Sequence, residues 1–262
     1  MENQVATKEA RATTIKGSGV KPATLEELMA MSTPEPSKTW TPVAHVAVPE
    51  AVERLVADRK WSFVDPDNKF DIVVTQDEVK MFGVTKVIIP GVEVDHEFQM
   101  AIGFRNSHDK SIALRVSVGV EVMVCYNMII TGDIQVRREH TLNIDPLETF
   151  GRAFDLIPDA ASRLTRWFGD LRNARISEAE GVAMLADAVE ADALPIVDFM
   201  AARDSFLTAY ANANPLVAHG GTVWSAYQAV TEQFKKHSLY RTQAYSTKLN
   251  ALVDNKFGFM LN

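Results

Sequence analysis

Apolar and polar residues alternate through residues 61–140, which is the pattern of β-strands because successive side chains point to opposite faces of a sheet. The longest run keeps its apolar residues on one parity from Ile112 to Val124, with Gly119 inside it. Thr131-Gly132-Asp133 predicts a turn before a last strand. We therefore predict a mainly antiparallel sheet of about five to seven strands over residues 61–140.

Helical spacing replaces this alternation after His140. Asp145-Pro146 provides a cap followed by a first-turn proline, and Ser177 with Glu180 has the sequence of a capping box. Pro158 predicts an interruption of the first of these helices, because proline has no backbone N–H to donate. The second half of the chain is thus predicted to be a series of amphipathic helices.

Strands and helices are segregated along the chain, which indicates an α+β fold rather than a parallel doubly wound sheet. We predict a single α+β domain over residues 43–262, in which the sheet block 61–140 packs against a C-terminal helical block, 144–256. Residues 1–42 are predicted to form a flexible N-terminal arm, since they combine a glycine-serine link with Pro34 and Pro36 and few apolar residues.

Composition narrows the class of protein. The chain has 262 residues, a formal net charge of -7 and one cysteine. One cysteine excludes a disulfide framework, and no apolar run approaches the roughly 20 residues that a membrane helix needs. The N-terminus lacks the basic start and apolar core of a secretory signal. We therefore expect a cytoplasmic protein without a membrane partner, and the negative charge excludes a uniformly basic coat on nucleic acid.

Cofactor and metal motifs are weak. Gly17-Ser18-Gly19 lacks the third glycine and the preceding strand of a dinucleotide loop, and the chain has no P-loop. A metal site would need His96, His108 and Asp109 to converge, whereas a solvated turn accounts for them more simply. Cys125 is interpreted as a buried structural thiol. We therefore expect no cofactor and no resident metal.

The polar segment 105–111, Arg-Asn-Ser-His-Asp-Lys-Ser, joins two predicted strands. It is longer than the roughly two to five residues that a hairpin needs. One interpretation is a solvated loop, because Asn and Asp favour turns. The other is an anion or phosphate site, because the side chains of Arg105, Ser107, Lys110 and Ser111 are suited to bind phosphate. The sequence leaves both open.

Charge is segregated in the helical block. Residues 177–204 hold seven acids and one base, whereas the chain from Lys235 onward holds five basic residues and one acid. Basic residues interleaved with aromatics, here and in residues 163–175, suit single-stranded nucleic acid. A solvated helix face with its aromatics turned inward explains the same pattern.

Residues 102–111, followed by Leu114-Arg115-Val116 and residues 122–127, resemble the phage/plasmid-like protein family, known as domain of unknown function 932. Residues 222–232 are similar to the family's Trp-x-x-x-Asn-Ala-x-Thr-Glu helix, with Gln228 where the family pattern has Asn. The resemblance covers roughly residues 45 to 250 and implies a phage, prophage or plasmid setting, and hence work on DNA or against host defences. A sheet followed by a long helix is also similar to the core of single-strand annealing proteins, by analogy of fold alone, which leaves a homo-oligomer open.

Our first hypothesis is a non-enzymatic accessory protein of DNA metabolism that binds single-stranded DNA. Its expected contacts are the residues of the polar loop, three strand arginines and the basic C-terminal helices: Arg105, Asn106, Ser107, His108, Lys110, Ser111, Arg115, Arg137, Arg138, Lys235, Lys236, Tyr240, Arg241 and Lys248. One alternative is an inhibitor of a host defence protein that uses the acidic block 177–204. The other is a metal-dependent hydrolase or nuclease that uses His96, His108 and Asp109.

Overall fold

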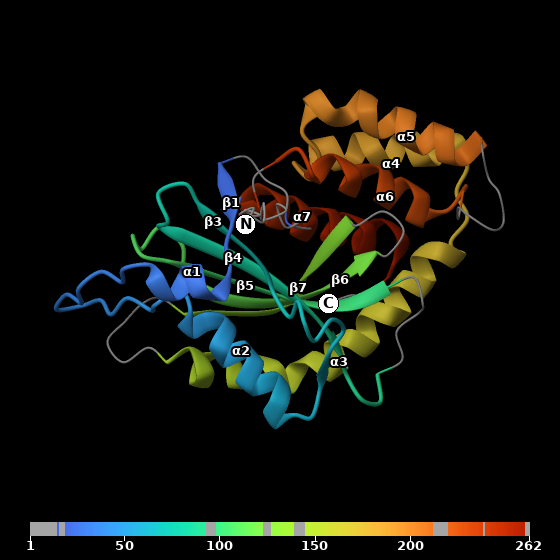
Figure 1. Cartoon of the computed structure of the whole chain (residues 1–262). Helices are drawn as coiled ribbons and strands as arrows, with labels where there is room; N and C mark the ends of the chain where they lie inside the picture. The colour runs from blue at the N-terminus through green and yellow to red at the C-terminus, as the bar shows by residue number, and fades with distance from the viewer. Residues whose placement is uncertain are drawn as a thin grey trace, which may run out of the picture.

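The fold is α+β, as predicted. It is described here from a computed structural model, which covers residues 15, 19–92, 98–122, 127–138, 145–211, 220–237 and 239–259. An open antiparallel sheet lies between two groups of helices, with α2 and the start of α3 on one side and α4–α7 on the other (Figure 1).

The sheet has seven strands, all paired antiparallel, within the predicted range. Six of them follow the order β1-β3-β4-β5-β6-β7, and β2 pairs with β4 beside this path. The strands are β1 (Val20–Pro22), β2 (Ser62–Phe63), β3 (Asp71–Thr75), β4 (Lys80–Ile88), β5 (Phe98–Ser107), β6 (Leu114–Val122) and β7 (Asn127–Arg138).

Helices α1 and α2 lie between β1 and β2 in the sequence, and the other helices follow the last strand. The helices are α1 (Leu25–Ala30), α2 (Ala47–Asp58), α3 (Pro146–Asn173), α4 (Glu178–Glu190), the short 3-10 helix η1 (Ile196–Asp198), α5 (Phe199–Ala211), α6 (Val223–Phe234) and α7 (Leu239–Phe257). In the described part of the chain, none of these helices combines the length and apolarity needed to cross a membrane.

The turn predicted at Thr131-Gly132-Asp133 is wrong, because β7 runs through these residues. The pairing with β6 is irregular there instead. Ser117 pairs with Gln135 and Gly119 pairs with Ile130, so a step of two residues on β6 matches a step of five on β7. The residues of the predicted turn therefore lie in an irregularity of the β6–β7 pairing, of the kind a β-bulge makes, and not between two strands.

The interruption predicted at Pro158 is also wrong, since α3 is one helix of 28 residues that contains this proline. Asp145 caps the helix as predicted, with its carboxylate accepting from the Leu147 backbone N–H. Phe154 and Ile157 before the proline and Leu164 after it are all buried. Packing of this apolar stripe offsets the hydrogen bond that a proline removes, which local sequence rules do not include.

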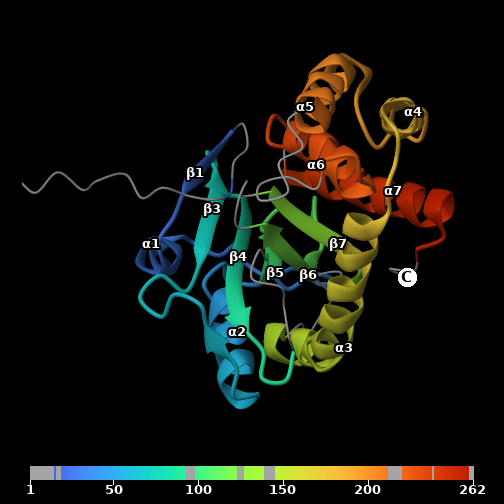
Figure 2. The ribbon, with the colours of Figure 1, turned by 90° about the vertical axis from the view of Figure 1, so that its right-hand side faces the viewer.

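One face of the sheet packs against α2 and the first half of α3. Met100, Ile102 and Phe104 on β5 are buried there with Val52 of α2 and Phe154 of α3. Fully burying each such side chain contributes about 1.5–3 kcal/mol, so this layer supplies much of the stability. Figure 2 shows how α3 then rises along the β7 edge toward the second group of helices.

The second half of α3 joins α6 and α7. Trp167 and Tyr227 pack edge to face with ring centroids 5.4 Å apart. The Trp167 indole donates to Asp254 of α7 at 2.7 Å, and the Tyr227 hydroxyl donates to Asn250 at 2.7 Å. Because Leu249 is fully buried as well, α7 has a fixed position over the sheet.

The described part of the predicted arm contributes regular structure. Val20 of β1 pairs with Thr75 of β3, and Thr24 caps α1 in a capping box with Glu27. Leu28 is buried. The residues before Gly19, apart from Ile15, lie outside the described residues, and the flexibility of the arm stays a prediction.

Candidate phosphate-binding site

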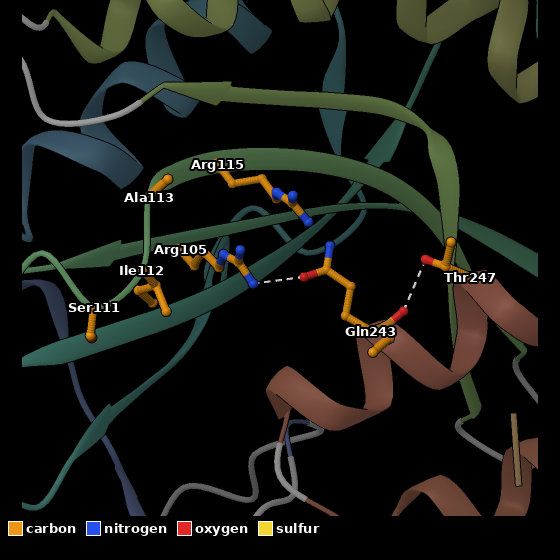
Figure 3. Close-up of a pocket in the computed structure, with 8 residues that line it drawn as sticks. Arg105, Ser111, Ile112, Ala113, Arg115, Gln243 and Thr247 are labelled. Carbon is orange, nitrogen blue, oxygen red and sulfur yellow. Dashed lines mark hydrogen bonds between the residues drawn. The ribbon is translucent and has the colours of Figure 1, made fainter. Parts of the chain in front are cut away.

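A pocket of about 300 Å³ lies between the β5–β6 hairpin and helix α7 (Figure 3). The hairpin supplies one wall and the helix the other. The lining residues are Arg105, Ser111, Ile112, Ala113, Arg115, Gln243, Ala244 and Thr247. Two of the described lining residues are charged, and both are arginines.

Strand register brings the two arginines together. Arg105 on β5 pairs directly with Arg115 on β6, so their side chains leave the same face of the sheet. Both extend toward α7 in Figure 3. Arg115 pairs in turn with Arg137 on β7, so the backbone places a third arginine position in the same row. The side chains of Arg137 and Arg138 lie outside the described residues.

Helix α7 meets the arginines through Gln243. The Arg105 Nη1 donates to Gln243 Oε1 at 2.8 Å, and Thr247 Oγ1 donates to the Gln243 carbonyl at 3.0 Å. Gln243 therefore holds the Arg105 guanidinium against the helix. Two guanidinium groups, a side-chain amide and two hydroxyls form a donor-rich site suited to an oxyanion.

Asn106 lies next to the pocket arginine but faces the interior. It is fully buried, and its Nδ2 donates to the Val43 carbonyl at 2.8 Å and lies 3.0 Å from His45 Nδ1. His45 Nε2 lies 3.1 Å from the Glu78 carbonyl. Asn106 thus ties the sheet to the segment before α2, and its placement gives it no route to a ligand in the pocket.

His108 stacks on His45 with ring centroids 3.7 Å apart and an interplanar angle of 6°. Its Nε2 lies 3.0 Å from the Val43 carbonyl. Burial lowers the pKa of His108 below its ordinary value, and the hydrogen bond with Val43 opposes this only in part. A half-buried neutral imidazole here supports the loop rather than adding positive charge to the pocket.

The predicted loop is shorter than expected, because its first three residues, 105–107, lie on β5. The residues that remain are held by contacts within the hairpin. The Ser107 hydroxyl donates to the Ile112 carbonyl at 2.7 Å. Asp109 accepts from the Ser111 backbone N–H at 2.9 Å and lies 3.6 Å from Lys80 Nζ. Burial raises the pKa of Asp109, but hydrogen bonds with Ser111 outweigh it, so the net shift is downward.

Lys110 projects over the Trp40 ring, with its Nζ 5.0 Å from the ring centroid. Its backbone has a positive φ of 65°, which a lysine adopts only in a tight turn. Of the predicted loop residues, the structure therefore brings Arg105 and Ser111 into the pocket together with Arg115. Asn106, Ser107, His108 and Lys110 make contacts that shape the hairpin.

The basic residues of the C-terminal helices face the acidic block. Lys236 Nζ lies 3.7 Å from Asp198, and Lys248 Nζ lies 3.3 Å from Asp192. Lys235 instead pairs with Glu232 on its own helix. Part of the segregated charge is therefore neutralised by ion pairs within the molecule.

Two predicted contacts of this region are only partly described. Arg241 is exposed on α7, and the side chain of Tyr240 lies outside the described residues. Arg241 is not among the described residues that line the pocket. Participation of the C-terminal basic residues in DNA binding, and of the acidic block in binding a host protein, stays a prediction.

Residues 163–175, in which arginines are interleaved with aromatics, fit the interpretation of a solvated helix face with its aromatics turned inward. Trp167 and Phe168 are buried, so they face the core rather than a ligand. Arg172 lies over the Trp224 ring and Arg175 donates to the Gly220 carbonyl.

The metal hypothesis gains no support in the described part of the chain. No group of three or more His, Cys, Asp or Glu residues there is arranged to hold a metal ion. His96 and Cys125 lie outside the described residues.

The α7 side of the pocket was missed by sequence reasoning. Gln243, Ala244 and Thr247 recur at helical spacing, which identifies one helix face. Nothing in a single sequence pairs that face with a hairpin more than a hundred residues earlier.

Comparison with known protein families matches residues 35–253, most of the chain, to the model of one family, described as Domain of unknown function (DUF932). No curated protein and no solved structure matches the chain.

Proposed function

The chain belongs to the DUF932 family, and we propose that it is a DNA-metabolism protein of a phage or plasmid that binds single-stranded DNA in the host cytoplasm. The resemblance noted in the sequence is thereby confirmed for the family, whereas the mobile-element setting and the DNA ligand are part of the proposal. The observation that carries it is the pairing of Arg105 with Arg115 across β5 and β6, beneath α7.

Two arginines fixed on neighbouring strands suit a phosphate ligand. A guanidinium presents parallel N–H donors that match two phosphate oxygens, and the strand pairing holds both groups on one face. On β7, the backbone of Arg137 pairs with Arg115, which adds a third arginine position next to these two. A row of positive charge across a sheet fits the repeating charge of a nucleic acid backbone.

The proposal is tested by fluorescence anisotropy with a 3′-labelled oligothymidylate at several salt concentrations. Arg105→Gln and Arg115→Gln should each weaken binding about tenfold, which is about 1.4 kcal/mol. Each should also reduce the slope of log K against log salt by about 0.7, the value for one lost contact with a single strand.

Arg54→Gln is the matched control. Arg54 is an exposed arginine of α2, which lies on the other side of the sheet from α7 (Figure 1). The variant carries the same change in net charge and should bind as the unmodified protein does. Equal losses in all three variants would show a diffuse charge effect, and no binding at low salt would rule out the proposed function.

A further inference from the structure

We propose that the pocket between the β5–β6 hairpin and α7 takes a phosphate monoester, so that the protein prefers DNA strands with a phosphorylated end. This inference rests on the proposed function, and it concerns the same two arginines. It names the chemical group that the pocket selects, which an internal phosphodiester does not carry.

Charge is the first argument. Arg105 and Arg115 bring two positive charges into the pocket, while its other described lining residues are neutral. A phosphate monoester carries a charge of about -1.5 to -2 at pH 7, because its second pKa is near 6. An internal phosphodiester carries a single negative charge. The pair of guanidinium groups therefore matches the monoester.

Shape is the second argument. Ser111, Ile112 and Ala113 form one wall, and Gln243 and Thr247 on α7 form the other. An internal phosphate needs room for the chain on both of its sides, whereas a terminal phosphate needs room on one. A pocket of about 300 Å³ has room for a terminal phosphate between these two walls.

The α7 wall is firmly anchored, so the pocket does not widen easily. Leu249 and Val253 of α7 are fully buried. Asp254 accepts the Trp167 indole N–H, and Asn250 accepts the Tyr227 hydroxyl. Moving the helix away from the hairpin would break these contacts together.

Gln243 gives the site its geometry. Its Oε1 holds Arg105 Nη1 at 2.8 Å, which fixes the plane of a guanidinium that has five N–H donors. The same contact provides a sharp test, because Gln243→Glu replaces this amide with a carboxylate of nearly the same shape. That change leaves both arginines in place and adds a negative charge beside the expected phosphate.

The experiment is a competition against a 3′-labelled oligothymidylate. The competitors are unlabelled strands of equal length with a 5′-phosphate, a 3′-phosphate or only hydroxyl ends, and, separately, inorganic phosphate and thymidine monophosphate. We expect a phosphorylated end to improve competition about tenfold over hydroxyl ends. Arg105→Gln, Arg115→Gln and Gln243→Glu should abolish that difference, whereas Arg54→Gln should keep it.

The outcomes separate the two proposals. Equal competition by phosphorylated and hydroxyl-ended strands overturns the monoester site and leaves the DNA-binding function standing. If strands do not bind but inorganic phosphate or the mononucleotide raises the Tm of the protein and not of Gln243→Glu, the pocket is confirmed and the DNA function fails. Absence of binding to all five competitors overturns both. A thermal unfolding curve of each variant shows whether it is folded.

Discussion

The residues of the 105–111 segment differ in what they contact. Arg105 and Ser111 line the pocket, whereas Asn106 binds Val43 and His45 in the interior. Neighbouring strand residues point to opposite faces, so Arg105 faces the pocket while Asn106 faces the interior. The resemblance to a family motif therefore does not make every motif residue a ligand contact.

His108 makes the stability of the protein depend on pH. Burial holds its folded pKa below the ordinary value of 6.5, so the unfolded chain takes up a proton first. The stability that depends on its neutral form is complete above about pH 6.5 and is lost as the pH falls through the lower folded pKa. Urea unfolding over this range should show a falling midpoint.

His108→Gln should show a flatter dependence over the same range, because glutamine can reach the Val43 carbonyl without titrating. Both proteins retain His45, so the difference between their curves isolates His108. Parallel curves for the two proteins would contradict this role.

At the scale of elements, helices α4 and α5 pack so closely at Gly181 that a larger side chain does not fit there. A Cβ on Gly181 of α4 would lie 2.0 Å from the Phe206 ring of α5, which is far inside contact distance. Gly181→Ala should therefore destabilise the protein by about 1–3 kcal/mol, because the ring has to move. The change is measured as a lower free energy of unfolding in urea.

Gly169→Ala in α3 is the matched control for that prediction. A Cβ at Gly169 meets nothing within 4 Å, so the variant gains helix propensity without a clash. It should stabilise the protein by up to about 1 kcal/mol. The prediction fails if the two alanine variants change stability in the same direction.

Sequence patterns were informative for elements and much less so for their contacts. Alternation located the sheet, and the caps at Asp145 and Ser177 located α3 and α4, because both signals are local. The predicted break at Pro158 failed because burial of residues on both sides decides the outcome. In the site, Arg105, Ser111 and Arg115 could be predicted from residue type. Gln243 and Thr247 could not, since only tertiary packing brings α7 to the hairpin.

At the scale of the whole molecule, the net charge of -7 is unevenly distributed, and basic residues of α7 form ion pairs with the acidic segment 177–204. Lys256 pairs with Asp187 and Lys248 with Asp192, and both contacts join α7 to the acidic segment. Asp198 differs from these acids because its side chain is only 9% exposed and accepts from His237 at 2.6 Å.

Burial decides how much each of these acids contributes. Asp198→Ala removes a buried carboxylate and leaves the largely buried His237 imidazole without this hydrogen-bond partner, which should cost about 2–4 kcal/mol of stability. Asp192→Ala removes an exposed carboxylate and should cost less than about 1 kcal/mol. Urea unfolding of the two variants measures the difference, and equal costs would refute the distinction.

The position of α7 has a consequence for protein synthesis. The sheet ends with β7 at Arg138, whereas the helix that walls the pocket begins at Leu239. A ribosome therefore releases both arginines well before it has made Gln243 and Thr247. Since chains fold as they emerge, the sheet can form while its pocket still lacks a wall. Nascent chains stalled before α7 should thus carry the arginines without the α7 wall, and should lack the proposed preference for a phosphorylated end.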